Sequence, residues 1–530
     1  MGLYLNPGNV GFEEIRRDIY VDKTGLIGYM NSLIGKPKPL VCFSRPRRFG
    51  KSFDASMLCA YYDRSCDSHA LFDGLEISET KEYEAHLNKY NVLSFDMTGF
   101  IHISGDRKVS PVERLQSALI RELRETYPEC MRPEEDDLGR VLYNIVSEQN
   151  IKFIFVIDEW DALFREFKDD KQLQTDYILF LRNLFKNRDL TPKIIAAAYM
   201  TGILPIKKYG TESALSDFRE FSMTGPAKMA RYVGFTEDEV KKLCLNHGMN
   251  FDDMKSWYDG YSFRQAPHVY SPNSVINAIQ NEEIQNYWTK TETFESLKQY
   301  IDRDFDGLKN DVILMLAGQH VKVDTGTFQN DITSFSNKDD ILTLLIHLGY
   351  LAYDQRQSEV YIPNREVSDA FQAAVKGGKW QPVEQAIKQS DRLLQATIDG
   401  DSSAVAETLE LVHEECSSVL TYNDENSLAC SIYIAYYTAR NDYMLIREFP
   451  AGKGFADYVF LPRRDVDKPA MIVELKYDRG ADTAICQIHN NRYEGILRDY
   501  AGELLLVGVS YFKDARGKNA KRHECVIERH

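Results

Sequence analysis

A short motif, GKS at residues 50–52, has the residue types and spacing to bind the phosphates of a nucleotide. It closes the stretch RPRRFGKS at residues 45–52, which follows an apolar run at 39–43 and precedes a segment of helical character at 53–62. In a loop between a strand and a helix, backbone N–H groups point at the phosphates, the lysine reaches the outer phosphates and the serine hydroxyl binds Mg²⁺. Arg45 stands where the pattern G-x-x-x-x-G-K-[ST] has its first glycine, so the match is partial.

Two carboxylates, Asp158 and Glu159, follow a second apolar run at residues 153–157. In phosphate-loop enzymes the first acid at this place holds Mg²⁺, and we expect Asp158 to share the ion with Ser52. The second acid can polarise the attacking water, so Glu159 is the predicted catalytic residue of hydrolysis. Helix N-termini attract acids in any case, but the position of this pair after the loop favours a nucleotide site.

A further strand is expected at residues 193–200, and Thr201-Gly202 ends it. A polar residue at the end of a strand beside the phosphate-loop strand commonly senses the γ-phosphate, and Thr201 is our candidate. The alternative is that Thr201 serves as a cap or turn residue before Gly202. The residues predicted to bind ATP are Arg47, Arg48, Phe49, Gly50, Lys51, Ser52 and Thr201.

A second constellation lies near the end of the chain, on two expected strands at residues 454–462 and 470–477. Because side chains alternate along a strand, Glu474 and Lys476 share one face, and a hairpin brings Asp457 alongside them. Two carboxylates and a lysine suit phosphodiester cleavage with Mg²⁺ or Mn²⁺. Surface hairpins often bear such residues, but here the charges interrupt an apolar strand, where unpaired charges are costly.

The motifs at residues 45–52, 157–161 and 201–204 resemble those of a bacterial family. Its members join an AAA-ATPase-like domain to a C-terminal PD-(D/E)XK nuclease-like domain. That family tolerates arginine and proline at the start of the phosphate loop. The resemblance continues through residues 234–240 and 257–261 and covers nearly the whole chain.

The resemblance implies roles for residues of the second constellation. Asp457 would be the first acid, and Glu474-Leu475-Lys476 would be the E-x-K element. Family members also carry a glutamate in the preceding helix, matched by Glu425, and a glutamine in the next helix, matched by Gln487. The implied substrate is nucleic acid, with DNA preferred, in defence against foreign DNA or in handling mobile elements. AAA-type sites often take an arginine from a neighbouring subunit, so assembly into a homo-oligomer is one alternative.

The elements that must position these residues indicate an α/β protein. The length of 530 residues predicts about three domains at roughly 150 residues each. We expect a P-loop domain of the AAA type, with a parallel sheet and helices, at 1–225 and a helical or winged appendage at 226–375. A helical linker at 376–415 would lead to a restriction-endonuclease-like α/β domain at 416–530.

Composition limits the classes of function. The net charge of −16 argues against a surface that is basic throughout. The nine cysteines include no C-x-x-C pair, which is typical of reduced cytosolic thiols. We expect no signal peptide and no membrane span, and therefore a cytoplasmic protein. One basic cluster could bind nucleic acid, or could be a solvated tail: Lys513, Arg516, Lys518, Lys521, Arg522 and His523.

Two functions from different classes remain. The first is an ATP-regulated or ATP-driven nuclease acting on DNA. The second is a nucleotide-switched protein whose inactive nuclease fold only binds nucleic acid or another partner. A nuclease that acts on RNA is a third, less favoured hypothesis.

Overall fold

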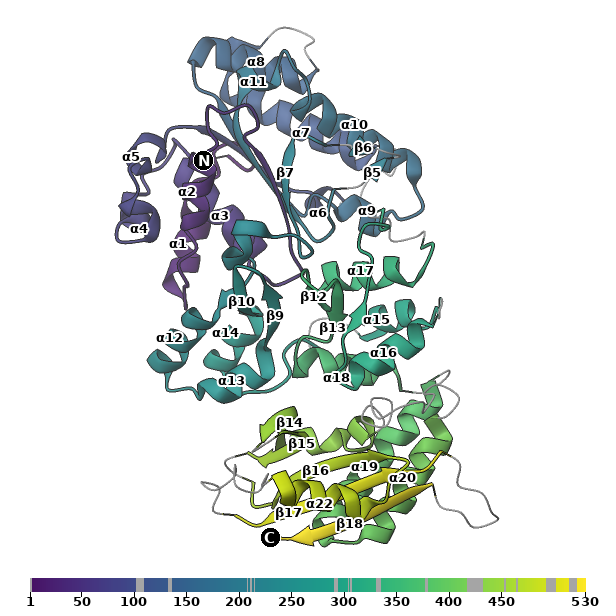
Figure 1. Ribbon diagram of the computed structural model, residues 1–530. Helices are drawn as coiled ribbons and strands as arrows, with labels where there is room; N and C mark the ends of the chain where they lie inside the picture. Colours follow the sequence, from purple (N-terminus) through teal and green to yellow (C-terminus); the bar gives the residue numbers. More distant parts are fainter. Residues whose placement is uncertain are drawn as a thin grey trace. The chain divides into compact units, whose positions relative to one another are not determined.

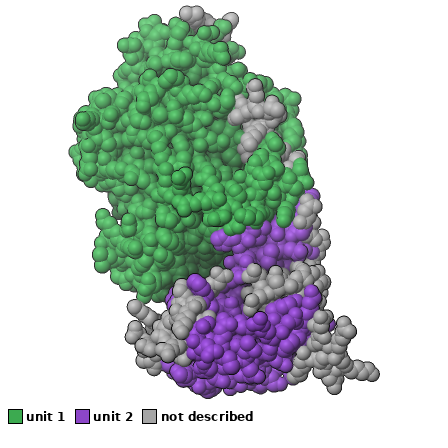
Figure 2. Space-filling model, viewed as in Figure 1, with its two compact units in different colours: residues 1–293, 322–369 green, residues 294–321, 370–530 purple. Residues whose placement is uncertain are grey.

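The computed structural model describes most of the chain, and Figure 1 shows its elements in sequence colours. The residues outside the description are 1, 102–108, 132–135, 207, 210–211, 214, 290–293, 304, 306, 330–334, 377–379, 417–431, 452–453, 464–465, 492–501 and 514–521. The chain divides into two compact units, which Figure 2 distinguishes by colour. Unit 1 holds residues 1–293 and 322–369, and unit 2 holds residues 294–321 and 370–530. The domain boundaries expected from the sequence stay predictions.

A parallel sheet of five strands forms the centre of unit 1, in the order β2-β3-β4-β1-β7. Its strands are β1 (Leu40–Ser44), β2 (Asn91–Asp96), β3 (Phe153–Asp158), β4 (Ile195–Gly202) and β7 (Phe218–Phe221). The apolar runs noted in the sequence become β1, β3 and β4, and most of their residues are buried on both faces, as parallel strands require. The expected parallel sheet is confirmed.

Helices cover the two faces of this sheet (Figure 1). On one face lie α7 (Pro111–Thr126), α8 (Leu138–Gln149) and α10 (Lys171–Phe185), and α3 (Lys51–Tyr62) packs on the other. Helix α7 begins with a capping box, in which the Ser110 side chain accepts from the Glu113 backbone and the Glu113 side chain accepts in return.

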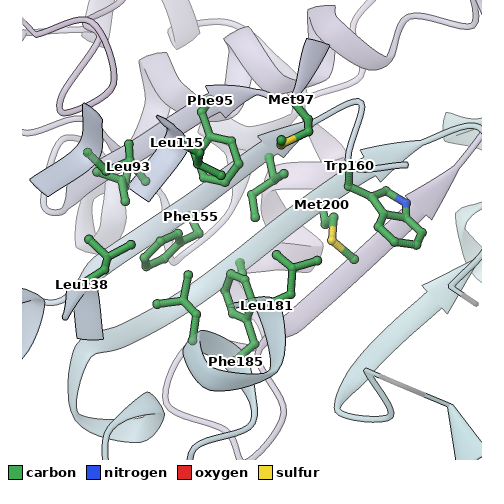
Figure 3. Close-up of a cluster of buried hydrophobic side chains, with 14 of the residues drawn as sticks. Leu93, Phe95, Met97, Leu115, Leu138, Phe155, Trp160, Leu181, Phe185 and Met200 are labelled. Atoms are coloured by element: carbon green, nitrogen blue, oxygen red, sulfur yellow. The ribbon is translucent and has the colours of Figure 1, made fainter. Parts of the chain in front are cut away.

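The largest apolar core of unit 1 lies between the sheet and these helices (Figure 3). Leu93, Phe95 and Phe155 from the strands meet Leu181 and Phe185 from α10, and all five are almost fully buried. The apolar positions Leu115, Leu119 and Leu123, spaced four apart in α7, join the same core. This core holds the C-terminal ends of the strands, where the candidate residues lie, in fixed positions.

The rest of unit 1 is a set of small helices and hairpins. It includes β9 (Asp259–Phe263), β10 (Ala266–Tyr270), α12 (Glu237–His247), α13 (Phe251–Tyr258), α14 (Pro272–Gln280), α17 (Lys338–Leu348), β12 (Ala352–Asp354) and β13 (Glu359–Tyr361). Helix α17 and strands β12 and β13 follow one another in the order helix, strand, strand.

The aromatic turn at residues 257–261 packs inside unit 1. The Tyr261 hydroxyl donates to the Gly349 carbonyl at 2.6 Å. A Cβ on Gly260, whose φ is +146°, would lie 1.7 Å from the Pro363 carbonyl oxygen, so only glycine fits there. These contacts favour a packing role for the turn.

Unit 2 is built on a mixed sheet in the order β14-β15-β16-β17-β18. Its strands are β14 (Tyr443–Ala451), β15 (Gly454–Pro462), β16 (Ala470–Tyr477), β17 (Leu504–Tyr511) and β18 (His523–Arg529). Only β16 and β17 are parallel, and the other neighbours are antiparallel. Strands β15 and β16 have the bounds expected for the hairpin that carries the second constellation.

Helices pack against this sheet within unit 2 (Figure 1). Helix α22 (Ala481–Asn491) contributes Ile485 and Ile488 to a core with Ile472 of β16 and Leu506 of β17. Other helices of this unit include α15 (Phe294–Ile301), α16 (Leu308–Leu316), α19 (Gln381–Asp399) and α20 (Ser402–Cys416). In the part of the chain that is described, each helix is too short or too polar to cross a membrane.

Candidate functional site

A cavity of about 880 Å³ opens beside the phosphate loop of unit 1. This volume lies within the usual range for small-molecule and cofactor sites. One wall is the loop with the first turn of α3, and the opposite wall comes from α1 (Val10–Arg17), the segment after it and α14. Residues of these walls include Ile19, Tyr20, Arg47, Arg48, Phe49, Gly50, Lys51, Ser52, Phe235, Asn273, Ile276 and Gln280.

The loop bends at two residues with left-handed backbone conformations. Gly50 is the N-cap of α3 with φ of +81°, and a Cβ there would meet no atom within 4 Å. Glycine is therefore required by the conformation and not by lack of space. Arg48, with φ of +66°, adopts the same strained region two residues earlier. Helix α3 starts at Lys51, so its first N–H groups and its positive dipole end face the cavity.

Arg45, which replaces the expected glycine, is a buried structural residue. Its Nη2 forms an ion pair with Asp54 Oδ2 of α3 at 2.5 Å and donates to the Tyr199 hydroxyl at 3.1 Å. Its Nη1 donates to the Tyr232 carbonyl at 2.6 Å, and the guanidinium lies over the Phe43 ring. Arg45 therefore ties the start of the loop to β1, α3, β4 and the segment around residue 232.

Lys51 is buried beneath the loop with only 5% of its surface exposed. Its Nζ donates to the carbonyls of Arg45 and Pro46 at 3.3 and 3.1 Å and lies 3.4 Å from Glu159 Oε1. Burial lowers the pKa of this ammonium, and the nearby carboxylates oppose that shift. The lysine is held at the base of the loop, next to the space where phosphates would enter.

Ser52 and Asp158 are neighbours, as expected for a shared Mg²⁺ site. Burial raises the pKa of Asp158 to about 6, and the nearby Ser52 hydroxyl opposes this shift. A hydroxyl and a carboxylate are hard oxygen donors of the kind that Mg²⁺ prefers, so this pair fits the ion. Among the described residues, no group of three or more His, Cys, Asp or Glu side chains could hold a metal, so phosphates and water would have to complete the coordination.

Glu159 follows Asp158 in a left-handed conformation, with φ of +48°. One carboxylate oxygen faces Lys51, and the other accepts a hydrogen bond from Arg165 Nη2. Arg165 also donates from Nε to Asp161 Oδ2 at 3.1 Å. The predicted catalytic carboxylate is thus enclosed by two cations at the edge of the cavity.

Thr201 occupies a different position from the one expected of a γ-phosphate sensor. It lies fully buried on β4, and its Oγ1 donates to the Phe43 carbonyl of β1 at 2.9 Å. It is not among the residues that line the cavity. It is also neither a cap nor a turn residue, because it belongs to the strand itself. The geometry favours a role in joining β4 to β1, and phosphate sensing stays a prediction.

Unit 2 brings Asp457, Glu474, Lys476 and Gln487 together. By the register of β15 and β16, Asp457 and Glu474 are the first residues beyond the last paired positions, Tyr458 and Val473. Asp457 Oδ2 accepts a hydrogen bond from the backbone N–H of residue 475 at 2.7 Å. Lys476 Nζ lies 3.1 Å from Glu474 Oε1, and Gln487 of α22 donates to the same oxygen.

The carboxylate of Glu474 is a candidate ligand for a divalent cation. Only 1% of the residue is exposed, and burial, assisted by the charge of Asp457, raises its pKa to about 7. Its Oε2 is buried and has no hydrogen-bond partner among the described residues. A buried carboxylate oxygen without a partner is costly, and a divalent cation between Glu474 and Asp457 would satisfy it. These residues therefore fit Mg²⁺ or Mn²⁺.

Some predicted residues fall elsewhere. Glu425 and much of the basic cluster lie outside the described residues. His523 of that cluster is buried, and its Nδ1 lies 2.9 Å from Glu410 Oε2 of α20, so it belongs to the fold of unit 2.

Sequence reasoning missed the far wall of the cavity and Arg165. The acid and base at positions 161 and 165 have the i,i+4 spacing of a helical ion pair, which was an available signal. Nothing in the sequence indicated that α14, more than two hundred residues after the loop, would face it.

The parallel sheet, the loop between β1 and α3, and the acids that end β3 define unit 1 as a P-loop NTPase-like α/β fold. Residues 8–211 match the family model described as "Predicted AAA-ATPase", so the chain contains an AAA-ATPase-like domain. No curated protein matches the chain.

Solved structures similar to the chain have low identity. The ORC2 protein of Aeropyrum pernix in ADPNP–ADP complexes is 9% identical, with a TM-score of 0.33, over 68% of this chain and 97% of that one. PCH-2 of C. elegans is 12% identical, with a TM-score of 0.21, over 51% and 62%. A DNA replication initiation factor is 14% identical, with a TM-score of 0.26, over 76% and 97%. TM-scores this low do not establish a shared fold.

Proposed function

We propose that this chain binds ATP with Mg²⁺ in the cavity of unit 1 and hydrolyses it there. The observation that carries the proposal is the arrangement at the base of the cavity, where Lys51, the Ser52–Asp158 pair and Glu159 surround the N-terminus of α3. Each group corresponds to one requirement of phosphoryl transfer: a cation for the outer phosphates, hard oxygens for Mg²⁺ and a carboxylate for water.

The residues of the chain have separate tasks in this proposal. The N–H groups of the loop and α3 bind the phosphates, and Lys51 exchanges its carbonyl contacts for phosphate oxygens. Glu159 accepts the proton of the attacking water while the bond from the γ-phosphorus to the ADP oxygen breaks. Neutralisation of phosphate charge is the chemistry that Mg²⁺ supplies when bound. The apolar wall, with Ile19, Phe235 and Ile276, would cover the base.

Titration of the full-length protein with a fluorescent ATP analogue tests the site. We expect Lys51→Ala to weaken binding at least about tenfold, because it removes the buried cation at the loop. Lys36→Ala is the matched control, since Lys36 is exposed and lies outside the cavity. Equal affinity of the Lys51→Ala variant and the wild type would refute the assignment.

We also propose that unit 2 cleaves nucleic acid, with DNA as the preferred substrate, at Asp457, Glu474 and Lys476. The support is the partnerless buried oxygen of Glu474 opposite Asp457, with a lysine on the same carboxylate. In this reaction water attacks the phosphorus, one P–O ester bond breaks, and the leaving oxygen takes up a proton. Lys476 would orient the water or stabilise the charge on the phosphate.

Cleavage of end-labelled DNA with Mg²⁺ or Mn²⁺ tests this second proposal. Asp457→Ala should abolish cleavage, whereas Asp467→Ala, an exposed acid between the same two strands, should not. Cleavage that continues unchanged in Asp457→Ala would show that the assignment is wrong. A wild type that binds DNA or another partner but never cleaves would favour the alternative, a nucleotide-switched binding protein. Matched RNA substrates separate DNA from RNA specificity.

We further propose that ATP regulates this cleavage, since both sites belong to one chain. The test is the same cleavage assay with and without ATP, repeated with Lys51→Ala. We expect the rate of the wild type, and not that of the variant, to change with ATP. A cleavage rate that changes neither with ATP nor with the Lys51→Ala substitution would refute the coupling and leave the nuclease proposal intact.

A further inference from the structure

Arg165 links the candidate catalytic carboxylate of Glu159 to the buried carboxylate of Asp161 in unit 1. It lies in the short helix α9 (Ala162–Glu166), lines the cavity and has 11% of its side chain exposed. Its Nη2 donates to Glu159 Oε2, and its Nε donates to Asp161 Oδ2 at 3.1 Å. The guanidinium is planar with fixed donor directions, so contacts at two of its nitrogens also fix its orientation.

Asp161 is a rigid anchor for this arginine. It is completely buried, and its Oδ2 also accepts from the backbone N–H groups of Ile203 and Leu204 at 3.2 and 2.9 Å. These two residues directly follow β4. A Cβ on Gly202 would lie 2.5 Å from Asp161 Oδ1, so the loop after β4 approaches the carboxylate as closely as glycine permits.

The two oxygens of Glu159 have different cationic neighbours. Oε1 lies 3.4 Å from Lys51 Nζ, a residue that phosphates would attract, whereas Oε2 is held by Arg165. Arg165 is itself anchored on Asp161 and not on the phosphate loop. Withdrawal of Lys51 toward phosphates would therefore release Oε1 and leave Oε2 in place.

We propose that Arg165 is a positioning residue for ATP hydrolysis: it holds Oε2 of Glu159 so that Oε1 is directed at the attacking water, and it ties this orientation through Asp161 to the loop after β4. The inference rests on the proposed ATPase function. In the step that it serves, Oε1 accepts a proton from water, the water oxygen bonds to the γ-phosphorus, and the bond from the γ-phosphorus to the ADP oxygen breaks. Arg165 gives up no proton.

Steady-state ATP hydrolysis by the full-length protein tests the role. We expect Arg165→Gln to lower kcat at least about tenfold, while KM and the Kd of the fluorescent ATP analogue stay within about threefold, because the phosphate contacts are not touched. Arg165→Lys should recover only part of kcat, since an ammonium cannot reproduce the fork that reaches both acids. The matched control is Arg182→Gln, which removes an exposed arginine of α10 outside the cavity.

A double variant separates positioning from a general loss of structure. In a Glu159→Gln background, the carboxylate to be oriented is gone, so Arg165→Gln should lower kcat by less than about twofold further. The proposal would be overturned if the two substitutions lowered kcat multiplicatively in the double variant. It would also be overturned if Arg165→Gln alone raised Kd tenfold or left kcat equal to that of the wild type.

The same measurements distinguish the positioning role of Arg165 from the ATPase function on which it rests. Hydrolysis that depends on Lys51 and Glu159 but not on Arg165 overturns the positioning role and keeps the ATPase. A wild type with no hydrolysis that depends on Lys51 overturns both.

Discussion

Restoring the glycine that the phosphate loop lacks should harm the protein. If Arg45 were merely a tolerated substitute, Arg45→Gly would leave stability unchanged and improve nucleotide binding. The structure predicts the opposite, because the Arg45 guanidinium is the buried counter-ion of Asp54 at 2.5 Å and also caps the Tyr232 carbonyl. Burial raises the pKa of the Asp54 carboxyl, and Arg45 is the main charge that opposes this shift.

The magnitude follows from the asymmetry of buried ion pairs. Removing one partner leaves an uncompensated charge in the interior and costs about 3–5 kcal/mol. We therefore expect Arg45→Gly to lower the free energy of unfolding of unit 1 by that amount. Adding Asp54→Asn should recover about 1–3 kcal/mol, because it replaces the orphaned carboxylate with a neutral amide of the same shape.

Urea unfolding of the full-length protein measures these changes. Tryptophan fluorescence reports on both units, through the buried Trp160 of unit 1 and the buried Trp380 of unit 2, and calorimetry separates the two transitions. A loss below about 1 kcal/mol for Arg45→Gly, or an Asp54→Asn change that adds to the loss, would contradict the ion-pair reasoning. Improved ATP affinity together with unchanged stability would mean that Arg45 only occupies the place of a glycine.

Four further predictions concern both sites. Because burial raises the pKa of Asp158 to about 6, Mg²⁺-dependent nucleotide affinity should fall as pH drops below 6, by about tenfold near pH 5; titrations with EDTA should show no such fall. Burial raises the pKa of Glu474 to about 7, so the wild type should lose stability as pH rises from about 4.5 to 7, whereas Glu474→Gln should lack this loss and should not cleave. An equal dependence of stability on pH in the wild type and in Glu474→Gln over this range would refute burial of Glu474 as the cause. Gly202→Ala should displace Asp161 and lower kcat of ATP hydrolysis with little change in Kd, which stopped-flow binding and hydrolysis assays can separate. Thr201→Val should cost about 1 kcal/mol through its lost hydrogen bond and leave kcat within about twofold; a tenfold fall would support phosphate sensing instead.

The sequence predicted elements well wherever local pattern and burial agree. Strands β15 and β16 were expected with the bounds that they have, because apolar runs end at polar turns. The meeting of Ser52 with Asp158 was also expected, since parallel strands end at one edge of the sheet.

Contacts between distant segments could not be predicted. The partner carbonyl of Arg45 is that of Tyr232, 187 residues away, and no local pattern encodes such a distance. Thr201 shows a different limit. A side chain in a strand can lie on either face of the sheet, and the sequence alone gives no sign of which face Thr201 takes. The partnerless oxygen of Glu474 likewise depends on the packing of α22 over the sheet.

The discontinuous composition of the units has a consequence for synthesis. Residues 294–321 belong to unit 2, where Trp380 donates from its indole N–H to Asp302 Oδ1 at 2.8 Å and is almost fully buried. On the ribosome these residues emerge before 322–369, the last segment of unit 1, and well before the sheet of unit 2. Helices α15 and α16 therefore leave the ribosome before their partners in unit 2: Trp380 follows about 60 residues later and the sheet about 120 to 210 residues later, at roughly 5–20 residues per second. For a period of seconds to tens of seconds, this segment is the part of unit 2 that a chaperone would have to protect.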